Sequence, residues 1–354
     1  MNISTLTREI AMRQSADFYL RFLSTLPDPD PVLQKTGKGI EAYRELTTDA
    51  HLYAAIQQRK AGVLSLPGYI DADEFLLNIL EPLLERLDQD ALISQILNAP
   101  LFGYTVLEIV WEPVYIGSRK WILPARVEEK PQEWFRFDQT NSLRYLSGNA
   151  AEGTPLPEKK FLLAQNDATY INPYGEKVLA RCYWPVIFKK SGLEFWVMFT
   201  ERYGLPFVIG KQPTASTEEE QAELLAKLDE MIHSSAAVIP DNSSVDIISF
   251  PSGASIDAYR YFLEFMNSEI SKAVLTQTLT TELQQRGSYA AARTHSAQLA
   301  KLHLADARLA EKTINRMLRW IVEINTSSLT THPMPRFRFD ISSLTTSNEK
   351  ENND

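Results

Sequence analysis

The side chains best suited to catalysis or metal binding are scattered along the sequence. The five histidines are His51, His233, His295, His303 and His332. His295 and His303 fall on one predicted helix, but they are eight positions apart, which is too far for both to ligate a metal ion from neighbouring turns. None of the 45 acidic residues forms a pair that its setting singles out, and Glu218–Glu220 is typical of a first helical turn, where the helix dipole favours negative charge. The sequence predicts no metal site, no cofactor and no catalytic residues.

The sequence motifs that mark common enzyme classes are absent as well. Lys35–Gly39 is only loosely similar to a phosphate-binding loop, because it lacks the Gly-Lys-Ser/Thr ending and a preceding strand. Neither a nucleophile elbow nor a dinucleotide fingerprint occurs. Cys182, the single cysteine, is predicted to be a small buried hydrophobe, and it permits no intrachain disulfide, which favours a reducing compartment. We therefore expect no enzyme, with a hydrolase or transferase built from dispersed carboxylates as the alternative.

One polar stretch, from Thr276 to Ser288, could do a different kind of chemistry. It is rich in threonine and glutamine and has almost nothing to bury, which predicts a loop. Hydroxyl and amide groups can hydrogen-bond transiently to a phosphate backbone without holding it as a cluster of lysines would. Such a loop suits a surface along which DNA moves.

Two long helices are predicted to position this loop. Before it, apolar residues recur every three or four positions between Ala254 and Leu275, which places them on one side of a helix. After it, a similar stripe runs from Tyr289 to Asn325, and a helix of that length measures roughly 50 Å at about 1.5 Å per residue. Two helices joined by a polar tip are expected to project a loop from a scaffold.

The region before residue 184 is predicted to be an α+β block. Apolar spacing predicts helices over 41–63, 73–86 and 90–101, and Gly103 ends the helical pattern. Alternation then predicts a strand from Tyr104 to Glu112, and shorter strands near 121–123, 134–138, 143–146 and 160–163. Helices followed by short strands favour a mostly antiparallel sheet.

The segment from Pro185 to Gly253 is predicted to contain a helix and a small module. Proline suits the first helical turn, so Pro185 is expected to begin a helix that ends at Tyr203. That helix is apolar on nearly every side, which indicates burial in a core or between subunits. A strand at 207–210, a helix opened by a capping box of Ser216 and Glu219, and strands at 236–240 and 245–250 are expected next.

The two ends of the chain are predicted to contain a linker and a polar tail. Pro27-Asp-Pro-Asp-Pro31 favours an extended, solvated linker over a metal site, since alternate prolines exclude a helix. The segment 326–354 is polar, and its last residues have the composition of a disordered tail.

Composition and charge narrow the class of protein further. Hydrophobic residues make up 44% and charged residues 23% of the 354, as in an ordinary globular protein of two or three domains. No secretory signal and no membrane span are recognisable in the sequence. The net charge of −9 disfavours a regulator that grips DNA by neutralising phosphates, but not a conduit that lets DNA pass.

Several phrases in the sequence together resemble the Mu-like phage portal proteins. They are distributed over about Glu41 to Asn325, which is most of the chain, and follow the order of that family. The phrases are Tyr43–Leu46, Arg59-Lys60, Gly103–Trp111, Asn172–Gly175, Tyr183–Lys189, Glu201–Pro206, Gly210–Pro213, Glu269–Leu275 and Thr278–Glu282.

The resemblance implies the phage portal fold, with an α/β wing, a two-helix stem, a small α/β clip, a tunnel loop and a long wing helix. The protein would form a ring, usually a dodecamer, at one capsid vertex of a virion assembled in the bacterial cytoplasm. Double-stranded DNA would pass through the ring during packaging and ejection. Its protein partners would be the terminase large subunit, the capsid, and the head-completion or tail adaptor proteins.

Carried onto this chain, the resemblance assigns a part to each region. Residues 1–40 would be an N-terminal arm, 41–184 the wing, 185–204 and 254–275 the stem, 205–253 the clip, 276–288 the tunnel loop, 289–325 the long wing helix, and 326–354 a tail in place of a full crown. The DNA channel would be lined by Thr278, Thr280, Thr281, Gln284, Gln285, Arg286 and Ser288. Stem contacts between subunits would use Phe188, Phe195, Trp196, Phe199, Tyr259 and Met266.

Overall fold

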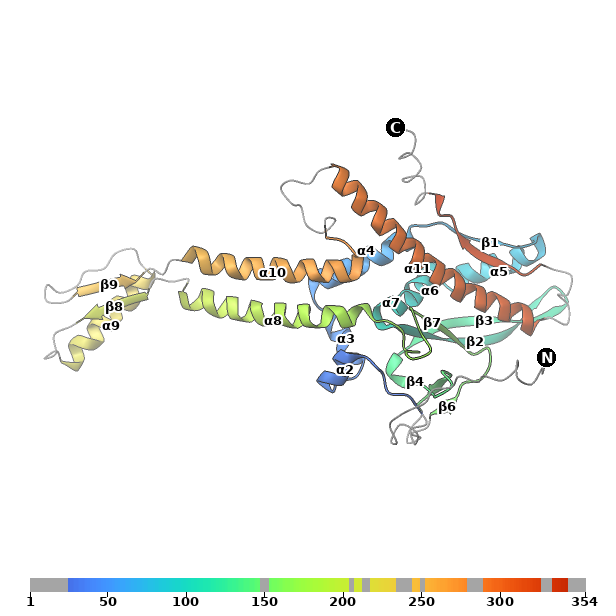
Figure 1. Ribbon diagram of the computed structural model, residues 1–354, viewed down its shortest axis with the longest axis horizontal. Helices are drawn as coiled ribbons and strands as arrows, with labels where there is room; N and C mark the ends of the chain where they lie inside the picture. The colour runs from blue at the N-terminus through green and yellow to red at the C-terminus, as the bar shows by residue number, and fades with distance from the viewer. Residues whose placement is uncertain are drawn as a thin grey trace, which may run out of the picture. The chain divides into compact units, whose positions relative to one another are not determined.

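The chain divides into two compact units. The computed structural model describes residues 25–146, 153–203, 207–211, 217–233, 244–248, 252–278, 289–325 and 333–342. The first unit comprises the residues up to Tyr183 together with those from Ile270 onward, and the second comprises Trp184–Glu269. Both units combine helices with antiparallel strands (Figure 1), so the predicted α+β class is confirmed.

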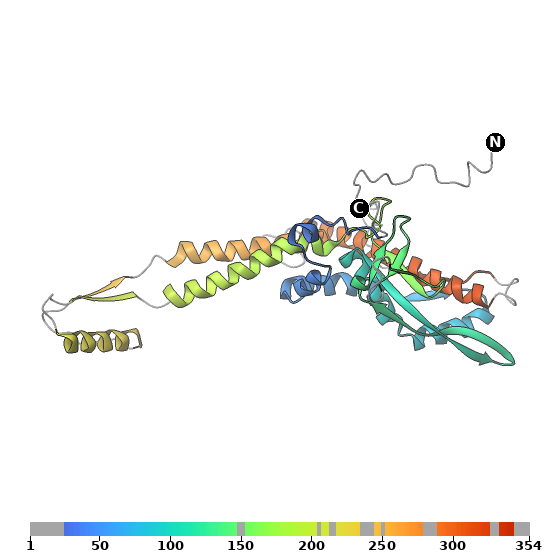
Figure 2. The same cartoon turned by 90° about the horizontal axis from the view of Figure 1, so that it is seen from below.

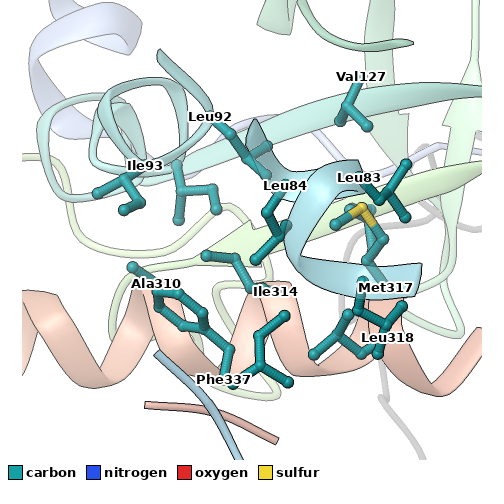
Figure 3. Close-up of a cluster of buried hydrophobic side chains, with 14 of the residues drawn as sticks. Leu83, Leu84, Leu92, Ile93, Val127, Ala310, Ile314, Met317, Leu318 and Phe337 are labelled. Carbon is teal, nitrogen blue, oxygen red and sulfur yellow. The ribbon is translucent and has the colours of Figure 1, made fainter. Parts of the chain in front are cut away.

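The core of the first unit forms around the long helix α11 (Tyr289–Ile324). Its inward residues Ala310, Ile314, Met317 and Leu318 pack against helices α5 (Glu74–Arg86) and α6 (Gln89–Ile96) and against the strands (Figure 3). All four are at most 1% exposed, so this stretch of the apolar stripe predicted from Tyr289 to Asn325 is buried. Burial of this kind contributes roughly 1.5–3 kcal/mol for each large side chain, which fixes α11 firmly in the unit.

The described residues of the first unit form three antiparallel sheets. The largest has the order β3-β2-β7, formed by β3 (Arg119–Lys130), β2 (Tyr104–Ile116) and β7 (Phe161–Gln165). A second joins β4 (Phe135–Phe137), β5 (Leu143–Tyr145) and β6 (Thr154–Pro155), and a third pairs β1 (Gly68–Asp71) with β10 (Arg336–Phe339). The four shorter strands expected after Glu112 are all present in sheets, and β2 and β3 are longer than predicted because they form one hairpin.

Two glycines in the family phrases allow the backbone before β2 to meet the turn after β7. Gly103 and Gly175 have φ angles of 88° and 73°, in the region that disfavours other residues. A Cβ on Gly103 would meet the Tyr174 carbonyl oxygen, and one on Gly175 would meet the Gly103 carbonyl oxygen. The turn predicted at Asn172–Gly175 is therefore present, and it packs directly on the end of helix α7 (Asn98–Phe102).

Some helix boundaries differ from those predicted. The helix expected over 41–63 is divided into α3 (Glu41–Leu46) and α4 (Ala50–Leu64), because the Asp49 side chain accepts a hydrogen bond from Leu52 N and starts a new helix. The helix expected over 90–101 is likewise divided into α6 and α7. The prediction that Pro185 begins a helix is wrong: α8 runs from Val178 to Tyr203, because buried residues at Leu179, Cys182 and Tyr183 extend its apolar side backwards.

The second unit consists of two paired helices and a small α/β part. Helices α8 and α10 (Ser252–Leu275) lie side by side and antiparallel in both views (Figures 1 and 2). Strands β8 (Phe207–Lys211) and β9 (Ser244–Ile248) pair with each other, and α9 (Glu218–His233) lies between them in sequence. The capping box is formed by Thr217 and Glu220, one position later than predicted, since each side chain bonds the other's backbone N–H. The strand expected at 236–240 lies outside the described residues.

The prediction of a solvated linker at Pro27–Pro31 is wrong. Asp30 is 6% exposed and accepts a hydrogen bond of 2.7 Å from the Tyr43 hydroxyl. Its neighbour Asp28 lies 2.8 Å from the ammonium of Lys177, a side chain that is itself buried. Asp30 also caps the short helix α2 (Pro31–Thr36). The buried ammonium of Lys177 compensates the charges of these two aspartates. The contacts therefore fix the segment to the rest of the first unit.

The polar C-terminal segment contributes to the core through strand β10, which the sequence analysis did not predict. Strand β10 lies within it, and its Phe337 and Phe339 are 0% and 5% exposed. The Asn315 side chain on α11 bonds both the N–H and the carbonyl of Phe337, at 2.7 and 3.0 Å. An amide side chain thus takes the place of a neighbouring strand and satisfies this edge of β10.

Candidate functional site

The predicted polar loop starts directly at the buried end of α10. Val274 and Leu275 are fully buried, and Thr276 then turns the chain with a φ of 60°. Gln277 is only 4% exposed, which the polar pattern of the sequence did not predict. Thr278 is half-buried. The other candidate channel residues, Thr280, Thr281, Gln284, Gln285, Arg286 and Ser288, lie outside the described residues.

A buried arginine ties the helix before the loop to the helix after it. Arg59 on α4 donates two hydrogen bonds to Asp306 on α11, at 2.6 and 2.8 Å. Its remaining terminal nitrogen donates to the Val274 carbonyl oxygen in the last turn of α10, at 3.1 Å. The side chains of Arg59 and Asp306 are 9% and 5% exposed. This contact holds α4, α10 and α11 in one arrangement where the loop begins.

Two histidines pack around the same junction. The imidazole of His303 on α11 lies flat against Gly62 of α4, where a Cβ would overlap the ring. Burial lowers the pKa of His303, so its neutral form is favoured. His51 Nε2 lies 2.7 Å from the Ser271 hydroxyl oxygen on α10. Both histidines thus have structural roles between helices.

The family phrase Arg59-Lys60 is explained by packing. Beside Arg59, the Lys60 ammonium is partly buried and donates to the Ser94 carbonyl and the Asn98 side chain, at 2.9 and 2.7 Å. Desolvation lowers the pKa of Lys60. Both basic side chains point into the unit and are therefore occupied by the fold.

The helix pair of the second unit exposes an extensive apolar surface. On α8, Phe188, Phe195, Val197 and Met198 are 49–59% exposed, and on α10 Tyr261 and Phe265 are 64% and 56% exposed. This surface excludes the first of the two predicted explanations for α8, burial in the core of its own chain. Exposed apolar patches of this kind mark sites of association with another surface.

The six predicted stem contacts do not all have the same environment. Phe188 and Phe195 are exposed, whereas Trp196, Phe199, Tyr259 and Met266 are half-buried. Phe199 and Tyr259 hold the two helices together, with ring centroids 5.8 Å apart. Phe188, Phe195 and Tyr259 also line an apolar groove of 430 Å³, whose floor is formed at Gly192 and Phe262. Phe188 and Phe195 are thus the members of the set that are open to a partner.

The described part of the chain contains no candidate metal centre. No three His, Cys, Asp or Glu side chains in those ranges gather closely enough to hold a metal ion. Burial raises the pKa of the Cys182 thiol to about 12, which suppresses the thiolate and confirms the predicted hydrophobic role. None of the described helices has the length and apolar character to cross a bilayer.

The buried partners of Asp30 were missed in the sequence because they are distant in it. Tyr43 and Lys177 lie 13 and 147 positions away, and no local pattern connects them. A row of exposed cations on α11, spaced by seven, four and seven positions, was also missed, although that helical spacing is visible in the sequence.

The chain is similar to known phage proteins over most of its length. The family model described as the portal protein of Mu bacteriophage matches residues 40–352. The portal protein of Escherichia phage Mu is 27% identical over 308 residues, which cover 83% of this chain and 59% of the relative. The Mu-like prophage FluMu protein gp29 of Haemophilus influenzae is 26% identical and is covered to 58%. The chain thus spans less than two thirds of the length of either relative.

Solved structures of similar fold come from gene transfer agent particles. Chains in the neck of the empty and native particles, computed with C6 and C12 symmetry, have TM-scores of 0.65 and 0.61. In each case 92% of this chain and 88% of the other are covered, at 10% and 12% identity. The likeness at such low identity is one of fold.

Proposed function

The chain belongs to the family of Mu bacteriophage portal proteins, and on that basis we propose that it assembles into a ring that forms the DNA conduit at one capsid vertex. Double-stranded DNA would pass through the ring inward during packaging and outward during ejection. The same ring would join the head of the particle to the tail. A closed ring of identical subunits uses two different faces of each copy, repeated around the axis.

The observation that carries the proposal is the exposed apolar surface on α8 and α10. A single chain leaves Phe195, Met198 and Phe265 more than half exposed on two paired helices. Such a surface is unfavourable in water and is relieved when equivalent helices of neighbouring copies pack together. The C12 symmetry of the similar neck structure supports a dodecamer as the assembly.

The parts of the portal are assigned to this chain as the family resemblance suggests. Residues 41–184 and 289–325 would form the wing, 185–204 and 254–275 the stem, 205–253 the clip and 276–288 the tunnel loop. The division into two units at Tyr183 and Ile270 supports separate wing and stem-plus-clip parts. The clip would meet the terminase large subunit and later the head-completion proteins, in particles assembled in the bacterial cytoplasm.

The portal role requires no catalytic site in this chain. The ATPase that drives packaging would be a separate protein, the terminase. The alternative of a hydrolase or transferase with dispersed carboxylates has no support from the phage Mu relative or from the matching family model, both of which are described as portal proteins. A ring that lets DNA slide is also compatible with a net charge of −9, because weak attraction leaves few barriers to movement.

A change in the loop tests the conduit. Replacing Thr280, Thr281 and Gln284 with lysine adds three positive charges where DNA is proposed to pass. Because each lysine can capture a phosphate, we expect packaging of DNA into heads to slow about tenfold or more, while rings still assemble. Packaging is measured as nuclease-protected DNA per head.

The matched control introduces three serines at the same positions, which keeps the loop polar and uncharged. This variant is expected to package at the normal rate. Normal packaging by the lysine variant, in heads shown to contain the ring, would exclude these residues from the DNA path.

A further inference from the structure

The solvent face of α11 carries a row of cations, Lys301, Arg308, Lys312 and Arg319, which we call the basic row. All four are exposed. Steps of seven, four and seven residues keep them within about 40° of one another around the helix and spread them over about 27 Å. None forms an ion pair with any residue whose position the structure describes. Among the described residues the basic row is therefore uncompensated, although the chain has a net charge of −9.

Helix α5 carries the complementary acidic row, Glu74, Glu81 and Glu85. These three are also exposed, and their steps are seven and four residues. Among the described residues, none of the three has a cation as a partner. Asp88 and Asp90, exposed beyond the end of α5, extend the negative surface.

The two rows match in spacing as well as in sign. The steps of seven and four residues from Glu74 to Glu85 equal those from Lys301 to Lys312, which matches two parallel helices. They also equal the steps from Arg319 back to Arg308, which matches two antiparallel helices. Each step corresponds to about 10 Å or about 6 Å along a helix. Either orientation therefore places three charges opposite three counter-charges.

The rows do not neutralise each other within one chain. Arg308 lines a groove beside β10, together with Arg336 and Arg338. Glu81 and Glu85 line a different groove beside β1, and Tyr69 of β1 contributes to both. The β1–β10 ribbon thus lies between the two surfaces, and each remains available to another molecule.

Only a second copy of this chain satisfies both rows with one kind of partner. Duplex DNA could neutralise the basic row, but its phosphates would be repelled by the acidic row, which would stay unexplained. We propose that the basic row of one copy docks on the acidic row of the next copy. This contact would repeat around the ring and fix the register of neighbouring subunits in the first unit, in addition to the apolar contacts of α8 and α10. The inference rests on the proposed ring.

Charge reversal tests the contact. The variant Arg308→Glu/Lys312→Glu gives a copy two acidic faces, and Glu81→Lys/Glu85→Lys gives a copy two basic faces. Each variant alone places like charges opposite each other at the contact. We therefore expect the number of rings in electron micrographs at moderate salt to fall to about one tenth of the wild-type number or below. Mixing the two variants allows them to alternate around a ring and is expected to restore assembly. The fourfold variant, which carries both reversals in one chain, is also expected to form rings.

A matched control separates the contact from net charge. Lys38→Glu/Lys120→Glu changes the net charge by the same amount as Arg308→Glu/Lys312→Glu, at two exposed cations of the first unit that lie outside both rows. It is expected to assemble as the wild type does. The fourfold variant shows in addition that the reversed side chains are compatible with folding.

The outcomes discriminate between the possibilities. Rings from both reversed variants at the wild-type level would overturn this inference and leave the proposed function intact. If the Arg308→Glu/Lys312→Glu variant then also lost salt-sensitive binding of duplex DNA, the basic row would be assigned to DNA. A wild-type chain that forms no ring in any condition would contradict the proposed function itself, and this inference with it.

Discussion

Replacing Arg59 with methionine is expected to destabilise the first unit by about 3–5 kcal/mol, the typical cost of leaving one partner of a buried ion pair unpaired. The carboxylate of Asp306 would remain inside the unit without its two hydrogen bonds, and the Val274 carbonyl at the end of α10 would lose its donor. Denaturant unfolding followed by circular dichroism measures the loss. Because Val274 lies two residues before the loop, we also expect faster hydrogen exchange in the last turn of α10.

Two further variants identify the buried charge as the cause. The double variant Arg59→Met/Asp306→Leu removes both charges and is expected to recover most of the stability. Arg86 is a matched control, since it too contacts one carboxylate, Glu112 at 2.6 Å, and one carbonyl, Pro124 at 2.7 Å, but its side chain is 46% exposed. Arg86→Met should cost below about 1 kcal/mol. Equal losses for Arg59→Met and Arg86→Met would contradict this account of the junction.

Replacing Phe195 with aspartate is expected to abolish ring assembly without unfolding the chain. Phe195 is 59% exposed in the single chain, so little of the chain's own stability depends on it. In the ring its burial would contribute about 1.5–3 kcal/mol at every interface, and an unpaired carboxylate in that position would oppose association further. Mass photometry of the purified variant measures the loss of the large species, and a melting curve confirms that the subunit stays folded.

A substitution on the polar side of the same helix serves as the control. Lys190→Asp introduces the same carboxylate on α8, on the side that carries Glu194 and Glu201, and all three positions are exposed. It is expected to leave assembly unchanged. Normal rings from the Phe195→Asp variant would show that this part of α8 faces solvent in the assembly.

The sequence predicts elements well where one local period continues for many residues. The stripes of α10 and α11 and the alternation that begins at Tyr104 are signals of this kind. Pro185 shows the limit of a local rule. Proline prefers the first turn of a helix, but this local preference is weaker than the stabilisation gained by burying Leu179, Cys182 and Tyr183. The helix therefore begins before Pro185 and continues through it.

Contacts between distant residues could not be predicted in this way. Whether Asp30 is solvated depends on Lys177, and whether the C-terminal segment is part of the core depends on Asn315. Gln277 lies in a polar run that predicts exposure, yet it is buried beside the end of α10. The exposed state of Phe195, which supports the ring, also follows only from the position of α10, because the sequence of a helix that is apolar on nearly every side does not show which apolar residues a neighbouring helix covers.

The most direct test of the central claim is electron microscopy of the purified full-length chain. The proposal predicts closed rings with a central channel wide enough for duplex DNA, in which the apolar surface of α8 and α10 is covered by the neighbouring copy. A folded chain that remains monomeric across a range of salt and protein concentrations, or that forms aggregates without a channel, would contradict it.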